Sequence, residues 1–576
     1  MPRRTAPEGN AKADSTMVDA HHRFWPKGQP KTLRVPATTL CRNLEIAAER
    51  YPQRAAVVFC GFELSYARLA EEVELLAGYL QHRCGVTKGD RVALFSQNCP
   101  QFFVAYYAIL RLGAAVVPVN AMSTTQDLEY LVRDSGARVA LLAQEMYERA
   151  RPLVDDGDLD HLVVHAYCDY VGEDCGIAVP DWVGAPRLGI NDPAVSHWHE
   201  ALAARRRAAP AGFDADQMAI LPYTSGTTGR PKGCIHTHRT LMASIAASAL
   251  WRGLHAESVF LAIAPLFHLM GMQNGMNLSI LLGATTVLLP RWDELSAAAL
   301  IERYKVSYWS AAPAMLVDFF SNPRIETCDL SSLALLAGGG AAMPEAVSLR
   351  LRDRYGIDFN EAYGLTETAS FLHANPIGRG KPQCLGIPTF GVDSRIVDPE
   401  TLEELPPGEV GELVTCADQV MVGYWNNEEA DREAFIHRDG KRFFRTGDLA
   451  CVDEDGYFFM RDRLKRMISV GGYKVWPAEV ENALYGHPDI QEVCIVGAPD
   501  RRSGELVKAL VVLKPERRGA VAEEAIIGWA RERMAAYKTP KRVEFRTSLP
   551  RSPAGKILWR ELQEQQANGR AGSAVN

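Results

Sequence analysis

Short runs of apolar residues alternate with segments of helical pattern along the first part of the chain. The runs lie at 92–95, 115–119, 139–142 and 162–164, and a helical stretch at 102–112 separates the first two. Continuous apolar runs of this length, spaced by helices, are typical of parallel strands that are buried on both faces of a sheet. The pattern therefore predicts an α/β fold with layered sheets.

The alternation restarts after a polar segment at 203–216. Further strands are predicted at 218–223, 259–264, 285–289, 306–310 and 334–337. From about 391 to 460, short strands and frequent turns predict a β-rich subdomain. The last part predicts a small α+β domain, with helices at about 477–485 and 521–534 and strands at 493–496 and 509–513.

These patterns predict four parts in the chain of 576 residues. They are a flexible N-terminal arm (1–30), a large domain that includes the β-rich subdomain (31–463), a small C-terminal domain (464–565) and a flexible tail (566–576). Hydrophobic residues at 47% and charged residues at 23% are ordinary for a globular protein, so disorder is excluded for most of the length.

Charge and cysteine content narrow the class of protein. The net charge is only −7 and the basic residues are dispersed, so we expect no nucleic-acid partner. Twelve cysteines lie between Cys41 and Cys494 without a C-x-x-C pair, which favours free thiols in a reducing cytoplasm over zinc or disulfides. The polar first twenty residues predict no secretory signal, and no apolar stretch has the length of a transmembrane helix.

The run 223–233 is built to hold an anion and follows directly on a predicted strand. Its hydroxyls can donate hydrogen bonds, its glycines let backbone N–H groups come close, and Lys232 adds a mobile positive charge. The spacing does not fit the P-loop, because Pro231 precedes the lysine and Gly233 follows it. The run predicts a nucleotide-phosphate site of another class, formed by Thr224, Ser225, Gly226, Thr227, Thr228, Gly229 and Lys232.

Further motifs follow this run in a fixed order. They lie at 264–268 (APLFH), 338–340 (GGG), 363–367 (YGLTE), 424–425 (YW), 445–448 (RTGD), 462–463 (DR), 471–479 (GGYKVWPAE) and 550–556 (PRSPAGK). In this order, over about 40–562, they resemble the acyl-adenylate-forming superfamily of acyl-CoA synthetases, firefly luciferase and peptide-synthetase adenylation domains. The sequence around 463–479 is most similar to bacterial long-chain fatty acyl-CoA ligases.

The resemblance implies an ATP-dependent acid–CoA ligase that uses Mg²⁺. The substrate carboxylate would attack the α-phosphate of ATP and release pyrophosphate, and the thiol of coenzyme A would then displace AMP from acyl-AMP. Both partners in the first step are anions, so cations and oriented N–H donors are needed there. At roughly 4 Å and an effective dielectric constant near 20, one lysine offsets about 4 kcal/mol of this repulsion.

The resemblance also implies a role for each motif. Lys556 would bridge the carboxylate and the phosphate, Glu367 would hold Mg²⁺ and Thr366 would contact a phosphate. Asp448 would accept hydrogen bonds from both ribose hydroxyls, with Arg463 as a second ribose contact. The implied nucleotide site is completed by Gly339, Gly340, Glu361, Ala362, Tyr363 and Gly364.

The C-terminal domain would be mobile, with a hinge at Lys465. Its neighbour Arg466 replaces the acidic residue often found there, which leaves the local pairing open. Gly471, Gly472 and Tyr473 would line a channel for coenzyme A, since glycines let a thin pantetheine arm pass close to the backbone.

Two positions bear on the acid. His268 stands where amino-acid-activating relatives carry an aspartate for the substrate ammonium group, so an amino acid is not expected. Gly364 stands where acetyl-specific relatives have a tryptophan, which predicts an open acyl pocket lined also by Gly338 and Gly339. A medium- or long-chain fatty acid is favoured. An aryl acid, a stand-alone loader that passes acyl-AMP to a carrier protein, and a homodimer stay open.

Overall fold

The computed structural model describes residues 20–210, 212, 214–224, 230–340, 343, 345–471, 473–500, 502–551 and 557–567. The chain forms two compact units. Unit 1 extends to Ser394 and includes Thr415–Phe444 and Glu454–Tyr457, whereas unit 2 comprises Arg395–Val414, Arg445–Asp453 and the chain from Phe458 onward. The domain limits drawn from the sequence remain predictions.

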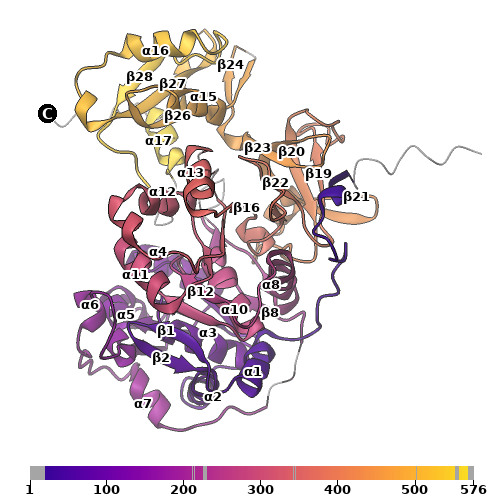
Figure 1. Cartoon of the computed structure of the whole chain (residues 1–576). Helices are drawn as coiled ribbons and strands as arrows, with labels where there is room; N and C mark the ends of the chain where they lie inside the picture. The colour runs from indigo at the N-terminus through magenta and orange to yellow at the C-terminus, as the bar shows by residue number, and fades with distance from the viewer. Residues whose placement is uncertain are drawn as a thin grey trace, which may run out of the picture. The chain divides into compact units, whose positions relative to one another are not determined.

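Unit 1 contains two large sheets, and the predicted α/β fold is confirmed (Figure 1). The first has seven strands, parallel except for the pairing of β11 with β8. In spatial order they are β11 (His236–Thr237), β8 (Met218–Ile220), β4 (Ala115–Val119), β3 (Arg91–Phe95), β5 (Val139–Ala143), β6 (His161–His165) and β7 (Val195–His197).

The second sheet has nine strands and is parallel from β16 to β1, with antiparallel strands at both edges. In spatial order they are β18 (Ile387–Pro388), β17 (His373–Ala374), β16 (Phe359–Tyr363), β15 (Leu335–Gly338), β14 (Tyr308–Ser310), β12 (Val259–Ala262), β13 (Thr285–Leu288), β1 (Ala55–Phe59) and β2 (Phe62–Ser65).

Helices cover both faces of the second sheet. One apolar core joins one face to α8 and α10 and continues into the first sheet, and another joins the opposite face to α11, α12 and α13. The helices of unit 1 are α1 (Leu40–Arg50), α2 (Tyr66–Arg83), α3 (Pro100–Arg111), α4 (Thr125–Ser135), α5 (Tyr147–Asp155), α6 (Asp181–Gly184), α7 (Trp198–Ala203), α8 (His238–Arg252), α9 (Leu269–Gly271), α10 (Leu278–Leu282), α11 (Glu294–Tyr304), α12 (Pro313–Ser321), α13 (Glu345–Tyr355) and α14 (Glu428–Ala434).

Local sequence explains where the helix that matters most for the site begins and ends. Thr237 caps the N-terminus of α8, since its side chain accepts a hydrogen bond from the backbone N–H of Thr240. Gly253 ends the helix in the left-handed conformation, with φ at +62°. Helix α8 is therefore defined at both ends by its own residues.

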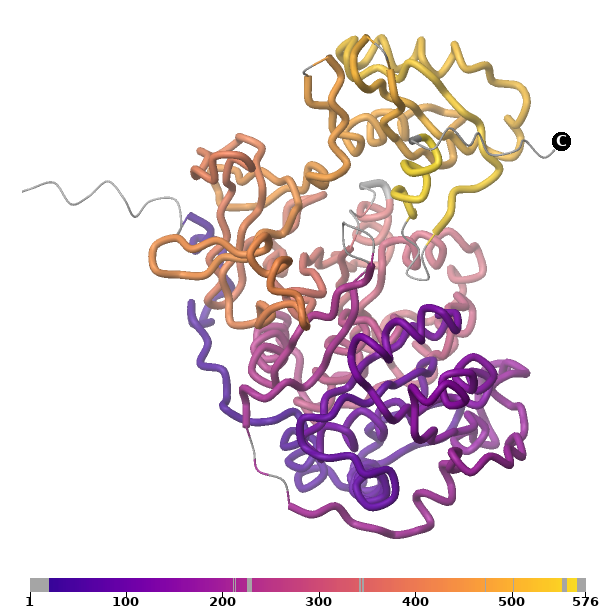
Figure 2. Tube along the Cα trace, turned by 180° about the vertical axis from the view of Figure 1, so that it is seen from behind, coloured from indigo at the N-terminus to yellow at the C-terminus, as the bar shows by residue number. Residues whose placement is uncertain are grey.

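The start of the described chain is ordered, although the sequence predicts a flexible arm over 1–30. Residues Ala20–Phe24 form a 3-10 helix, and Trp25 is buried with its ring 4.9 Å from that of Trp251. We call residues 20–31 the N-terminal strap; in Figure 2 it is the indigo stretch that leads toward α1. Its aromatic residues give it apolar area to bury, which a purely polar arm lacks.

Unit 2 contains the predicted small α+β fold. Its sheet has the order β25 (Tyr473–Val475), β24 (Ile468–Val470), β27 (Gly504–Leu513) and β26 (Ile490–Asp500), with β28 (Arg542–Phe545) parallel to β27. Helices α15 (Pro477–Tyr485) and α16 (Glu523–Arg531) share an apolar core with one face, and α17 (Trp559–Ala567) shares one with the other. The strands of the β-rich region, which is divided between the two units, are β19 (Asp393–Val397), β20 (Gly411–Cys416), β21 (Phe435–Arg438), β22 (Lys441–Val452) and β23 (Phe458–Arg463).

All twelve cysteines are free thiols, eight of them buried and four partly exposed. Among the described residues, no helix is both long and apolar enough to cross a membrane.

Candidate active site

The anion-binding run is a β-hairpin. Strand β8 ends at Ile220, and β9 (Tyr223–Thr224) pairs with β10 (Lys232–Gly233), so that Thr224 lies opposite Lys232. Ser225, Gly226, Thr227, Thr228 and Gly229, which connect the two strands, lie outside the described residues. The predicted phosphate-binding residues that are described thus stand at the base of this hairpin.

Two tyrosines fix the hairpin to α4. The hydroxyl of Tyr223 donates to Asp134 Oδ2 at 2.6 Å, and the hydroxyl of Tyr130 donates to the Pro231 carbonyl at 2.7 Å. Burial, followed by the nearby Asp134 carboxylate, raises the pKa of Tyr223 well above its usual value, so this hydroxyl keeps its proton. The base of the hairpin is therefore held by side chains outside the motif.

Tyr424 connects the hairpin to the predicted metal-binding acid. Lys232 Nζ lies 5.1 Å from the centre of the Tyr424 ring, and the Tyr424 hydroxyl donates to Glu367 Oε1 at 3.2 Å. The backbone N–H of the next residue, Trp425, donates to the Gly233 carbonyl at 2.8 Å. Unit 1 thus brings Lys232 and Glu367 to one tyrosine.

Thr366 and Glu367 lie in a tight turn that follows β16. The turn is a 3-10 helix (Thr366–Thr368), and it is followed by two residues in the left-handed region, Ala369 at φ +50° and Ser370 at φ +80°. Such backbone is uncommon for residues other than glycine and clusters at functional sites.

His236 holds this turn, and the sequence reasoning missed it. Its Nε2 lies 2.7 Å from the Thr366 carbonyl, to which it donates, and its Nδ1 lies 3.0 Å from the Thr240 hydroxyl. The ring is fully buried, and burial lowers the pKa of His236 to about 4, so the imidazole is neutral. The available signal was a histidine three residues beyond the anion-binding run, directly before a helix cap.

The three-glycine motif allows close contact between strands β14, β15 and β16. A Cβ at Gly338 would lie 1.9 Å from the Ala311 carbonyl oxygen, and one at Gly339 would lie 2.0 Å from that of Ala362. Gly340 has φ at +87°. These glycines are required by the backbone itself, whatever ligand lies beside them.

Glu361, which is predicted to bind the nucleotide, is buried, and its carboxyl group accepts hydrogen bonds from the protein backbone. Its oxygens accept from the backbone N–H groups of Met343 and Cys384, each at 3.3 Å, and burial raises the pKa of Glu361 to about 7. The neighbouring Tyr363 is also buried, with its ring 5.6 Å from that of His373.

Gly364 has a local reason to be glycine. A Cβ there would lie 2.2 Å from the Ser370 carbonyl oxygen, because the left-handed turn folds back over it. His268, the other predicted determinant of the acid, is exposed at the N-terminus of α9, and its ring lies 4.8 Å from that of Phe267. A π-helix (Met272–Asn277) follows α9, and such segments are frequent at functional sites.

Unit 2 brings the two predicted ribose contacts together. Asp448 on β22 pairs in register with Arg463 on β23, and Arg463 Nε lies 3.0 Å from Asp448 Oδ1. Asp448 is 1% exposed and Arg463 is 43% exposed. Behind them, Arg445 donates twice to Glu412 Oε2, at 2.9 and 2.6 Å, which supports the turn that leads into Asp448.

The predicted hinge and coenzyme A residues are surface features of unit 2. Lys465 is exposed, Gly471 has φ at +57°, and Tyr473 is 62% exposed and stacks on Tyr537 with ring centres 4.8 Å apart. Gly472 and the predicted catalytic Lys556 lie outside the described residues.

No group of three or more His, Cys, Asp or Glu side chains in the described part of the chain is placed to hold a metal ion. Glu367 is the predicted metal-binding carboxylate beside the hairpin. Mg²⁺ is commonly held by one or two carboxylates together with substrate phosphates, so a single carboxylate next to an anion-binding hairpin fits this ion.

The chain is similar to known protein families, sequences and solved structures. The model of the AMP-binding enzyme family matches residues 44–425, and that of the AMP-binding enzyme C-terminal domain matches residues 479–556. A long-chain-fatty-acid–CoA ligase of Bacillus subtilis is 36% identical over 94% of this chain and 97% of its own, and a feruloyl-CoA synthase of Amycolatopsis is 35% identical over 90% and 97%. The structure of the anthranilate CoA ligase AuaEII with anthranoyl-AMP matches with a TM-score of 0.80 at 27% identity, over 93% of this chain and 98% of that one.

Proposed function

Because this chain belongs to the AMP-binding enzyme family, we propose that it is an ATP-dependent acid–CoA ligase whose substrate is a medium- or long-chain fatty acid. The observation that carries the proposal is the arrangement of Lys232, Tyr424 and Glu367 at the anion-binding hairpin, within a chain that aligns over nearly its whole length with a fatty-acid–CoA ligase.

In the first half-reaction, an oxygen of the acid attacks the α-phosphorus of ATP, the bond to the β-phosphate breaks, and pyrophosphate leaves. Thr224 and Lys232 hold the outer phosphates, and Asp448 with Arg463 holds the ribose. Glu367 would bind Mg²⁺, whose positive charge would offset the negative charge of the phosphates. Lys556 places its ammonium group between the carboxylate and the phosphate, where two anions must meet.

In the second half-reaction, the thiolate of coenzyme A attacks the acyl carbon and AMP leaves with the bonding electron pair. Gly471, Gly472 and Tyr473 line the route of the pantetheine arm, with Lys465 as the hinge. A hydrophobic acid tail needs little more than an apolar cavity, so a few kcal/mol of pocket shape decide among such acids. The exposed His268 offers no carboxylate for an ammonium group, which supports an acid without an amino group.

The second candidate is an aryl-acid CoA ligase, favoured by the likeness to the feruloyl-CoA synthase and the anthranilate CoA ligase. The test is thioester formation with coenzyme A and ATP, followed by mass spectrometry over fatty acids of eight to eighteen carbons and a set of benzoates and cinnamates. We expect kcat/KM to be at least tenfold higher for the best fatty acid. A higher kcat/KM for an aryl acid would contradict the fatty-acid proposal and identify the protein as an aryl-acid CoA ligase.

A stand-alone loader is tested in the same assay by replacing coenzyme A with a carrier protein that bears phosphopantetheine. Acyl transfer to the carrier, with none to free coenzyme A, would identify a loader. We further propose a cytoplasmic location, in line with twelve free thiols, and a homodimer, to be tested by sedimentation equilibrium.

A further inference from the structure

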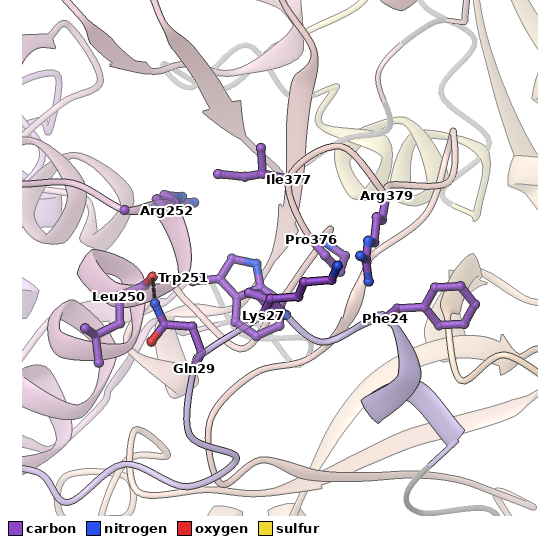
Figure 3. Close-up of a pocket in the computed structure, with 11 residues that line it drawn as sticks. Phe24, Lys27, Gln29, Leu250, Trp251, Arg252, Pro376, Ile377 and Arg379 are labelled. Atoms are coloured by element: carbon purple, nitrogen blue, oxygen red, sulfur yellow. Dashed lines mark hydrogen bonds between the residues drawn. The ribbon is translucent and has the colours of Figure 1, made fainter.

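A pocket of about 290 Å³ lies in unit 1, apart from the residues assigned above to ATP, acid or coenzyme A. It is formed by the N-terminal strap, the end of α8 and the loop 376–379 (Figure 3). The strap is held to the helix here, since Gln29 Nε2 donates to the Leu250 carbonyl at 3.2 Å. Three segments far apart in the sequence therefore enclose one space.

The charged groups of the pocket all have the same sign. Its wall carries Lys27, Arg252 and Arg379, and no Asp or Glu is among the described residues that line it. Lys27, on the strap, and Arg379, on the loop, are both exposed. Three cations without an acid make the pocket a place of positive potential, which attracts anions.

Arg252 is the strongest indication of a ligand, because it is a buried cation without a carboxylate. The residue is only 5% exposed, and no ion pair joins it to any described acid. Its Nη1 donates to three neutral oxygens, on Ser248 at 2.6 Å, Asn274 at 2.8 Å and Tyr308 at 3.0 Å. Its Nε is buried without a hydrogen-bond partner. The guanidinium carbon also lies 4.8 Å from the centre of the Phe371 ring and 5.7 Å from that of Tyr308, so aromatic faces offset part of the cost of burying this charge. An anion in the pocket would supply the counter-ion that neutral oxygens and aromatic rings do not.

Two carbonyl groups in the last turn of α8 are already hydrogen-bonded. The Ala249 carbonyl accepts from the backbone N–H groups of Gly253 and Leu254, and the Leu250 carbonyl accepts from Gln29. The negative end of the helix is thus already hydrogen-bonded where it faces the strap.

The rest of the wall is apolar. Leu250 and Ile377 are large apolar side chains with 38% and 53% of their surface exposed, and Phe24 and Trp251 line the pocket beside them. Exposed apolar side chains next to fixed positive charge suit a ligand with an anionic head and a short apolar tail. At roughly 30 Å³ for each heavy atom, the volume holds about ten such atoms.

We propose that this pocket binds a small amphiphilic carboxylate, of the size of octanoate, as a ligand separate from the acid that is activated. The head group lies against Arg252, Lys27 and Arg379, and the tail lies against Trp251 and Ile377. The ligand adds to the contacts that already hold the strap against α8. Because α8 begins next to His236, which holds the Thr366 turn, the ligand is bound at the far end of the helix that supports the catalytic turn.

Hydrogen–deuterium exchange of the full chain, with octanoate and without ATP, tests the proposal. We expect slower exchange in peptides that cover 20–31 and 376–380, by at least threefold at saturation. The uncharged 1-octanol should give no such protection. The double variant Lys27→Ala/Arg379→Ala should weaken the octanoate response about tenfold or more. The matched control Arg83→Ala/Lys88→Ala, which removes two exposed cations elsewhere in unit 1, should leave that response unchanged.

Three results would overturn the proposal. They are no protection of these two peptides by octanoate, equal protection by 1-octanol, or an unchanged response in Lys27→Ala/Arg379→Ala. The exchange is measured without nucleotide, so a failed ligase assay leaves this result readable. Arg252→Lys, which keeps the charge but not the planar head, should weaken octanoate binding without loss of the folded state.

Discussion

His236 offers a sharp test of how the turn Thr366–Thr368 is held. Its imidazole is buried and neutral, and it donates from Nε2 to the Thr366 carbonyl. His236→Gln keeps an N–H donor at a similar distance along the side chain but does not titrate. His236→Leu removes both properties at similar volume, so the two variants separate the hydrogen bond from the charge.

The magnitudes follow from the buried position. In His236→Leu the partly buried Thr366 carbonyl loses its donor, which costs about 1–3 kcal/mol, or about 5- to 150-fold in the local opening equilibrium. In the wild type the folded pKa of about 4 lies below the unfolded value of about 6.5. The unfolded form therefore gains a proton first as pH falls, and stability is lost between pH 6.5 and pH 4, reaching about 3 kcal/mol in full and about 2 kcal/mol at pH 5.

The assay is hydrogen exchange of the peptide 359–372, corrected for the intrinsic pH dependence, at pH 7.5 and pH 5. We expect His236→Gln to match the wild type at pH 7.5 and to exchange more slowly than the wild type at pH 5. His236→Leu should exchange faster than both at pH 7.5. The buried His238 titrates in the same range, but it is present in all three proteins and cancels in the comparison.

A kinetic measurement separates positioning from simple folding. The KM for ATP in the presence of Mg²⁺ should rise at least fivefold in His236→Leu and stay near the wild-type value in His236→Gln. The reasoning fails if both variants change KM equally, or if the peptide 359–372 exchanges at wild-type rates in His236→Leu.

Three further outcomes are expected. Tyr424→Phe removes the hydroxyl that donates to Glu367, so the Mg²⁺ concentration for half-maximal activity should rise about five- to tenfold, for about 1 kcal/mol of lost hydrogen bonding; unchanged Mg²⁺ dependence would contradict this. Gly364→Ala places a Cβ 2.2 Å from the Ser370 carbonyl, so kcat/KM should fall equally for octanoate and palmitate, and a selective loss of palmitate would instead make Gly364 a pocket wall. Lys556→Ala should abolish acyl-AMP formation and spare thioester formation from synthetic acyl-AMP; equal loss of both would remove its assigned role.

The strands could be predicted from the sequence because parallel strands buried on both faces are plain apolar runs. Helix α15 was predicted with the same limits that the structure shows, since Pro477 marks its first turn. The predicted strand 218–223 is divided in two, because Pro222 has no N–H for the sheet.

Sheet membership could not be predicted. Val57 pairs with Thr286 and Val116 pairs with Ile220, so each sheet joins strands that lie far apart in the sequence. Apolar periodicity reports that a strand is buried, but not which strand lies beside it. The division of the strands between two sheets therefore depends on the packing of the whole fold and cannot be predicted from the apolar pattern.

In the candidate site, the motifs contain the residues proposed to bind ATP but not the side chains that hold these residues in place. Residues that would touch ATP, such as Lys232, Glu367 and Asp448, lie in motifs and were found. The side chains that hold them, such as His236 and Tyr130, act over distances of about one hundred residues or more. A spacing pattern cannot reveal such partners, because they meet only through the fold.

Arg466 shows how a departure from a motif can be explained by its surroundings. Its guanidinium is largely buried and pairs with Glu481, with Nη1 at 3.2 Å from Oε2, and Asp462 lies 3.9 Å away on its other side. Burial lowers the pKa of Arg466, but the carboxylates of Glu481 and Asp462 outweigh this effect and raise it above its usual value. Glu481 also accepts a hydrogen bond from the backbone N–H of Ile495. An acid at this position would add a third carboxylate to two that are already buried. The arginine is thus matched to its neighbours, and Lys465, the predicted hinge, precedes a side chain anchored inside unit 2.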